Sequence, residues 1–114
     1  MNNRCAALLA SSAILALTTV TTARAAVDEA AAKALAKRND CFKCHAIDKT
    51  KKGPSYKKIA EKYKGKPEGQ DKAIKNMTTA SKVKLEDGTE EDHKIIDTKD
   101  PKELKNLADW ILSR

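Results

Sequence analysis

The chain has 114 residues, with 23 Lys and Arg against 16 Asp and Glu and a formal net charge of +7 at pH 7. This length limits it to one small domain, and with only 4% aromatic residues a core built from side chains alone is marginal. The basic residues are mixed with acidic ones along the chain, which favours a solvated surface or acidic protein partners over nucleic acid.

The N-terminal segment has the features of a secretory signal peptide. Arg4 precedes an apolar stretch over residues 6–20, and Ala23, Arg24 and Ala25 then give a small-x-small peptidase site. The apolar stretch is shorter than the roughly 20 residues that span a bilayer, so no stable membrane insertion is expected after cleavage. We predict a signal peptide at residues 1–25 and a periplasmic domain at residues 26–114.

The first predicted element of the domain is a helix that begins after Asp28, a favourable N-cap, and continues to Arg38. Asn39 and Asp40 are expected to end it just before Cys41. The apolar face of this helix is predicted to consist of Ala30, Ala31, Ala34 and Leu35.

The next segment, Cys41-Phe42-Lys43-Cys44-His45, has the sequence C-x-x-C-H, which is the attachment motif of a c-type haem. Two thiols at this spacing can each add to one vinyl group of a porphyrin, and the adjacent imidazole can then reach the iron. We therefore predict one haem c, with Cys41 and Cys44 as thioether anchors and His45 as the proximal iron ligand. Burial of the macrocycle would also supply the apolar contacts that the core lacks.

Further helices are predicted after a loop that ends in Gly53-Pro54. Ser55 is a suitable N-cap for a helix through Tyr63, and a third helix is expected from Gln70 to about Thr78. Residues 81–97 are less regular, and the Asp87-Gly88 turn signal is consistent with a small hairpin.

The last helix has the clearest start, because Asp100 is a suitable N-cap and Pro101 occupies the first turn. Trp110 is expected on the flank of its apolar face. The predicted fold class is all-α, with about four short helices around the haem and a possible hairpin before the last helix.

These features together resemble the small bacterial class I cytochromes c. The resemblance rests on the C-x-x-C-H motif, the Gly53-Pro54 turn, the run from Tyr56 to Tyr63 and the terminal run from Asp109 to Ser113. It implies a haem clamped between the first and last helices, and it implies that the carbonyl of Pro54 orients His45 through the second ring nitrogen.

The sixth iron ligand is where the chain departs from that family, which usually supplies a methionine shortly before the final helix. No methionine follows Met77, and His93 occupies the corresponding loop. We therefore predict ligation by His45 and His93, and a low reduction potential. Met77 is the alternative ligand, although its place on a predicted helix suits packing better. An open site, another ligand such as Asn76, or a solvated His93 also remains possible.

The predicted function is the transfer of single electrons between redox proteins with acidic docking surfaces, without catalysis of its own. Lys43, Lys51 and Lys52 near the attachment motif are candidate docking residues. The main alternative is a haem protein whose open or labile sixth position binds or senses a small ligand.

Two less favoured alternatives use the same residues without a haem. Cys41, Cys44, His45 and His93 have the composition of a tetrahedral zinc site, but the adjacency of Cys44 and His45 makes joint ligation awkward. The C-x-x-C pair could also belong to a thiol-disulfide oxidoreductase or form a simple disulfide. No βαβ pattern surrounds the motif, which argues against the oxidoreductase.

Overall fold

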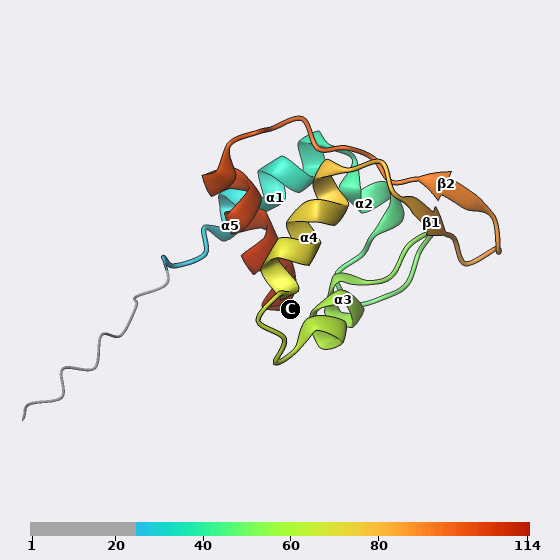
Figure 1. Cartoon of the computed structure of the whole chain (residues 1–114), viewed down its shortest axis with the longest axis horizontal. Coiled ribbons are helices and arrows are strands. Elements are labelled where there is room, and N and C mark those ends of the chain that lie inside the picture. Colours follow the sequence, from blue (N-terminus) through green and yellow to red (C-terminus); the bar gives the residue numbers. More distant parts are fainter. Residues whose placement is uncertain (1–24) are drawn as a thin grey trace, which may run out of the picture.

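The computed structural model describes residues 25–114, so the predicted signal peptide lies outside the described part except for Ala25. In this part, five helices and one two-stranded hairpin follow one another along the chain (Figure 1). Their bounds are α1 (Glu29–Arg38), α2 (Cys41–Cys44), α3 (Tyr56–Tyr63), α4 (Gly69–Thr78), β1 (Lys82–Lys84), β2 (Glu90–Asp92) and α5 (Pro101–Leu112). The domain is mostly helical, as predicted; only the single-turn helix α2 was not anticipated.

Three helices begin at the residues that the sequence indicates. The side chains of Asp28, Ser55 and Asp100 each accept a hydrogen bond from a backbone N–H in the first turn, at 2.9, 3.1 and 2.8 Å. Each bond satisfies a backbone donor that the helix itself leaves without a partner. Local side-chain chemistry therefore fixes where α1, α3 and α5 start.

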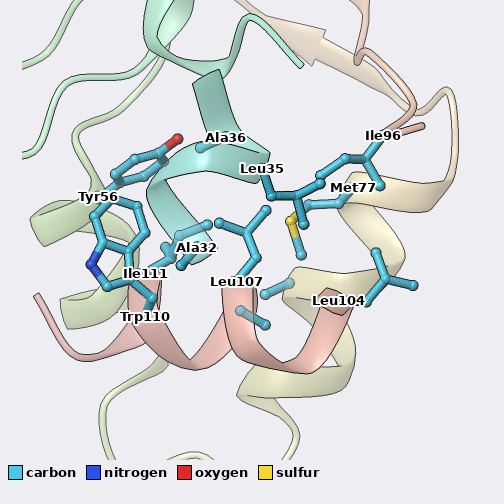
Figure 2. Close-up of a cluster of buried hydrophobic side chains, with 12 residues drawn as sticks. Ala32, Leu35, Ala36, Tyr56, Met77, Ile96, Leu104, Leu107, Trp110 and Ile111 are labelled. Carbon is cyan, nitrogen blue, oxygen red and sulfur yellow. The ribbon is translucent and has the colours of Figure 1, made fainter. Parts of the chain in front are cut away.

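Helix α5 lies at the centre of the packing, because it contacts α1, α3 and α4. Its Leu107 and Trp110 are fully buried. Figure 2 shows these side chains beside Tyr56 of α3 and Leu35 of α1. The prediction that Trp110 lies on the flank is wrong, because the rings of Phe42 and Tyr56 cover that side of α5, with ring centres 6.4 and 5.4 Å from Trp110.

The predicted apolar face of α1 is also largely wrong. Leu35 is buried as expected, but Ala30, Ala31 and Ala34 are exposed. The buried residues of α1 are Ala32, Leu35 and Ala36. An alanine-rich helix presents several similar faces, so packing against α5 decides which one is buried. This packing is secured at one end by Asn106 of α5, whose side chain exchanges two hydrogen bonds of 2.8 Å with the backbone of Asp28.

The irregular stretch before α5 contains the antiparallel hairpin β1–β2, in which Lys82 pairs with Asp92 and Lys84 with Glu90. Its turn includes Gly88, whose φ of 84° lies in the left-handed region that glycine adopts without strain. The hairpin projects on the side of the domain away from α5 (Figure 1). It delivers the chain to His93, the residue that follows β2.

Candidate functional site

The C-x-x-C-H motif lies directly after α1, at a sharp turn of the chain. Asp40 has a φ of 58°, a left-handed conformation that Asp tolerates better than most residues, and it redirects the chain into α2. Cys41 and Cys44 are the two ends of this single turn, and residues three apart share one face of a helix. Both thiols are free and partly buried, and burial raises the pKa of Cys41.

His45 is fixed by the Gly53-Pro54 turn. Its Nδ1 lies 2.6 Å from the carbonyl oxygen of Pro54, and the N–H of Gly53 donates to the carbonyl of Cys44 at 2.8 Å. A carbonyl only accepts hydrogen bonds, so Nδ1 carries the proton and the lone pair of Nε2 is left free. Burial lowers the pKa of His45, and this outweighs the opposing effect of Pro54, so the imidazole is held in the neutral form that binds metals.

The turn approaches the imidazole so closely that only glycine fits at residue 53. A Cβ at Gly53 would lie 2.9 Å from Cε1 of His45 and 3.2 Å from its Nδ1. Tyr56 packs against the same imidazole, with the rings nearly parallel at 20° and their centres 5.4 Å apart. His45 therefore has little freedom to rotate.

His93 is brought to the same place by the hairpin. Its backbone N–H donates to the carbonyl of Ser81 at 2.9 Å, which continues the hairpin by one more pair. Its Nδ1 lies 3.0 Å from the carbonyl of Lys94, so this ring has the same tautomer as His45 and also keeps Nε2 free. The two ring centres are 6.2 Å apart.

This separation fits a single metal ion between the two rings. A metal bonds an imidazole nitrogen at about 2 Å, and the ring centre lies roughly 1 Å further away, so two imidazoles on one ion have centres about 6 Å apart. The fold thus brings two imidazoles that are 48 residues apart in the sequence to the ring-centre distance expected for two ligands of one metal ion. Within the described residues, no group of three or more His, Cys, Asp or Glu side chains is arranged to hold a metal ion.

Both histidines line a cavity of about 980 Å³. This volume lies at the upper end of the range of roughly 300–1,000 Å³ that is usual for ligand pockets, and it suits a large cofactor. Its apolar lining includes Ile59, Ala73, Leu107 and Ile111, and the two cysteines lie on its wall. The residues present therefore fit a porphyrin, which Cys41 and Cys44 could attach and which His45 and His93 could bind at its iron.

Met77 and Asn76, the alternative ligands, also line this cavity. Met77 is 8% exposed and belongs to the hydrophobic core. Figure 2 shows its sulfur among the core side chains near Leu35 and Leu107. Its environment is that of a packing residue, whereas His93 has its unprotonated nitrogen available.

Two residues near the site were not identified from the sequence as parts of it. Asn39 was interpreted only as a helix end and Tyr56 only as part of a helix face. Asn39 is buried, and its side chain bonds to Asp97, 58 residues away. A buried amide at the end of a helix gives no local signal of a partner so distant in sequence.

Across residues 25–114, no helix has the length and apolar character needed to cross a membrane.

Comparison with known proteins gives one family and two informative structures. A sequence model of the cytochrome c family matches residues 29–114. The chain is similar to the class 1 cytochrome MtoD from Sideroxydans lithotrophicus ES-1, with 57% sequence identity and a TM-score of 0.74, over 77% of this chain and 97% of that one. It is also similar to cytochrome c552 from Nitrosomonas europaea, with 28% identity and a TM-score of 0.56, over 71% of this chain and 96% of that one. Among curated proteins no significant match was found.

Proposed function

Because the chain belongs to the cytochrome c family, with the class I fold and one covalently attached haem c, we propose that it carries single electrons between protein partners in the periplasm. In this proposal Cys41 and Cys44 would hold the haem through thioether bonds, and His45 and His93 would bind its iron. The observation that carries the ligand assignment is the distance of 6.2 Å between the two imidazoles, each with Nε2 free.

The haem supplies a one-electron couple, and the chain sets the orientation and basicity of the two histidines proposed to bind its iron. The carbonyl of Pro54 holds the Nδ1 proton of His45, which orients the ring and raises the basicity of Nε2. The carbonyl of Lys94 acts in the same way on His93. With His45 and His93 both bound to the iron, the haem would supply one-electron exchange with little rearrangement of the chain, and this would suit a carrier.

Electron paramagnetic resonance of the ferric protein tests the ligand assignment. We expect a low-spin bis-imidazole signal in the wild type and its loss in His93→Ala. Met77→Leu, which keeps the approximate volume of a core residue, is the matched control and should retain the signal. An unchanged signal in His93→Ala would contradict the role of His93, and a low-spin His/Met signal in the wild type that is kept in His93→Ala but lost in Met77→Leu would support the alternative ligand.

The alternative function, binding or sensing of a small ligand, requires an open or labile sixth position. The close approach of His93 to His45 argues against it. Carbon monoxide added to the reduced protein distinguishes the two functions. Slow binding that is limited by departure of the distal histidine supports the carrier, and prompt binding supports the sensor.

Lysine side chains at the mouth of the cavity are the proposed docking sites for acidic partners. Lys58, Lys62 and Lys84 line the cavity, and none of them has an ion pair among the described residues. Of the lysines near the motif, Lys43 pairs with Asp40 at 3.2 Å and Lys51 donates to the carbonyl of Phe42 at 2.5 Å. The pair of Lys43 is exposed, so it is weak and Lys43 remains available.

The docking proposal predicts a strong dependence on salt. Electron transfer to an acidic protein should slow as the ionic strength rises, because screening shortens the range of attraction to about 8 Å at 0.15 M. Transfer to a small neutral oxidant is the control and should change little. If the rate with the acidic protein is independent of salt, the lysines do not guide docking.

A further inference from the structure

The segment that follows His93 is fastened to distant parts of the chain at several points. We call residues 93–97 the distal segment. At its start, the N–H of His93 donates to Ser81, and further along the N–H of Ile96 donates to the carbonyl of Met77 at 2.9 Å. Ile96 is buried with 6% exposure, whereas Ile95 is 53% exposed. The segment therefore lies across the surface of the core and depends on its anchors.

The anchor at the end of the distal segment is the side chain of Asn39, which is only 4% exposed. Its Oδ1 accepts the backbone N–H of Asp97 at 2.9 Å, and its Nδ2 donates to the Asp97 carboxylate at 2.9 Å. The second hydrogen on Nδ2 goes to the carbonyl of Leu35 at 3.0 Å. One amide thus joins the end of α1 to the end of the distal segment.

These three bonds define the orientation of the Asn39 amide. A flipped amide would place its oxygen against two acceptors, the carbonyl of Leu35 and the Asp97 carboxylate, and would leave the N–H of Asp97 facing a donor. No other standard side chain of this size offers two donors and an acceptor in this arrangement. Asn39 is buried although the Asp97 side chain is half exposed, so removal of the amide leaves the N–H of Asp97 and the carbonyl of Leu35 without this partner.

The other anchors on this side are exposed ion pairs. Lys94 lies 3.1 Å from Asp40, with side chains 59% and 47% exposed, and Arg38 lies 3.2 Å from Asp97, with side chains about half exposed. Exposed pairs contribute little because water and salt screen them. Asn39 is therefore the dominant contact between the attachment region and the segment that carries His93.

We propose that Asn39 is a positioning residue for the distal ligand: its hydrogen bonds to Asp97 keep the distal segment in the conformation that presents Nε2 of His93 to the cavity. This inference rests on the proposed function, in which His93 is an axial ligand. Without the Asn39–Asp97 contact, the segment is expected to open locally more often, and each opening withdraws the His93 imidazole. Asn39 thereby determines how often the His93 imidazole leaves the sixth coordination position of the iron.

The rate of carbon monoxide binding to the reduced holoprotein tests this role, because the incoming molecule must wait until His93 leaves. We expect Asn39→Ala to bind about tenfold faster than the wild type, since it loses all three hydrogen bonds of a buried amide. Asp97→Ala, which keeps the backbone N–H for Asn39, should bind about threefold faster. Asp97 does not line the cavity, so a faster rate in this variant does not arise from a wider cavity.

Asn106→Ala is the matched control. Asn106 also joins the first helix to a distant segment with two hydrogen bonds, but it does so away from the cavity, at Asp28. It should lower the free energy of unfolding while leaving the binding rate as in the wild type. If Asn39→Ala and Asp97→Ala bind at the rate of Asn106→Ala, the contact is only structural and the proposal is wrong.

The double variant Asn39→Ala with His93→Ala separates this proposal from the one it rests on. If both are correct, His93→Ala alone binds fastest, and adding Asn39→Ala changes nothing further. If His93 is not an axial ligand, His93→Ala has the wild-type binding rate and spectrum, and the proposed function fails first. If His93→Ala binds fast but Asn39→Ala and Asp97→Ala do not, the ligand assignment stands and the positioning role of Asn39 fails.

Discussion

The two histidines of the cavity are held by contacts of very different range in the sequence. His45 is fixed by a carbonyl nine residues away in Pro54, and its neighbour Gly53 closes the same turn. His93 relies on the hairpin, and the segment after it relies on Asn39, which is 58 residues from Asp97. The surroundings of His45, which we call the proximal side, are thus organised by one short stretch of chain. The surroundings of His93, which we call the distal side, depend on contacts across the completed fold. When the protein is destabilised, we expect local opening on the distal side to occur before opening on the proximal side.

The largest expected effect comes from removing each histidine in turn. His45→Ala should reduce the yield of haem protein by roughly tenfold or more, because the ligand adjacent to Cys44 and its supporting turn are lost together. His93→Ala should retain covalently bound haem, since the proximal stretch is intact. Mass spectrometry and absorbance of the exported proteins measure the two yields. Equal losses would contradict the difference between the two sides.

The second expected effect is on the reduction potential and concerns the distal side alone. His93→Met should raise the potential by on the order of 0.1 V, because axial ligands tune haem potentials over about 0.8 V and a thioether favours the reduced iron. The carboxylates of Glu91 and Asp92, which line the same cavity, should keep the potential of the wild type low. Redox titration of both proteins checks this. A wild-type potential already as high as that of the variant would contradict it.

The same contrast of range explains which parts of the site the sequence could predict. The helix starts at Asp28, Ser55 and Asp100, the attachment motif and the Gly53-Pro54 turn depend on neighbours within a few residues, and the sequence indicates each of them. The family, the haem c and the mostly helical fold predicted from these features are confirmed. The ligand assignment of His45 and His93 stays a prediction that the spectra must test.

The predictions that were wrong or incomplete concern residues whose burial or bonding depends on contacts between elements distant in the sequence. The buried face of α1 was wrong because its alanines differ little from one another and α5 selects among them. Trp110 was placed on the flank because periodicity within α5 does not reveal the rings of α2 and α3 that cover it. Asn39 was interpreted as a helix end, which it is, but its bonds to Asp97 join residues that no local pattern connects.

The third prediction measures how tightly the proximal turn encloses His45. Gly53→Ala should destabilise the protein by about 1–3 kcal/mol, since the new Cβ would lie 2.9 Å from the imidazole. It should also shift the absorption bands of the haem, because the ring must move. Denaturant unfolding and absorption spectra provide the measurements.

Gly65→Ala is the matched control for this glycine. Its φ of 71° makes alanine unfavourable by roughly 1–2 kcal/mol, but no atom beyond its two chain neighbours lies within 4 Å of the added Cβ. It should lower stability without altering the spectrum. A spectrum of Gly53→Ala identical to that of the wild type would mean that the turn does not constrain the ring.

The smallest expected effect concerns the acid sensitivity of the distal side. The donated hydrogen bond from Asn39, together with Arg38, lowers the pKa of Asp97 below its ordinary value of about 4. A carboxyl group whose pKa is lowered by folding stabilises the folded state above its ordinary pKa, and this contribution is lost as the pH falls through the lower pKa of the folded state. The protein should therefore lose stability on acidification, partly through this group.

Asp97→Asn removes the titrating charge but keeps an oxygen that can accept the bond from Asn39. The wild type should be more stable than this variant near pH 6, and the difference in the free energy of unfolding should shrink as the pH falls below about 4. Asp87→Asn at the hairpin turn is the control: hydrogen bonds from Thr89 lower the pKa of Asp87, so its removal should give a similar pH dependence. Asp97 contacts Asn39 and Asp87 does not. Only the substitution at Asp97 should therefore also change the rate of carbon monoxide binding, which depends on how often His93 leaves the iron. A difference between Asp97→Asn and the wild type that stays constant from pH 6 to about 2 would show that the charge of Asp97 does not strengthen the distal anchor.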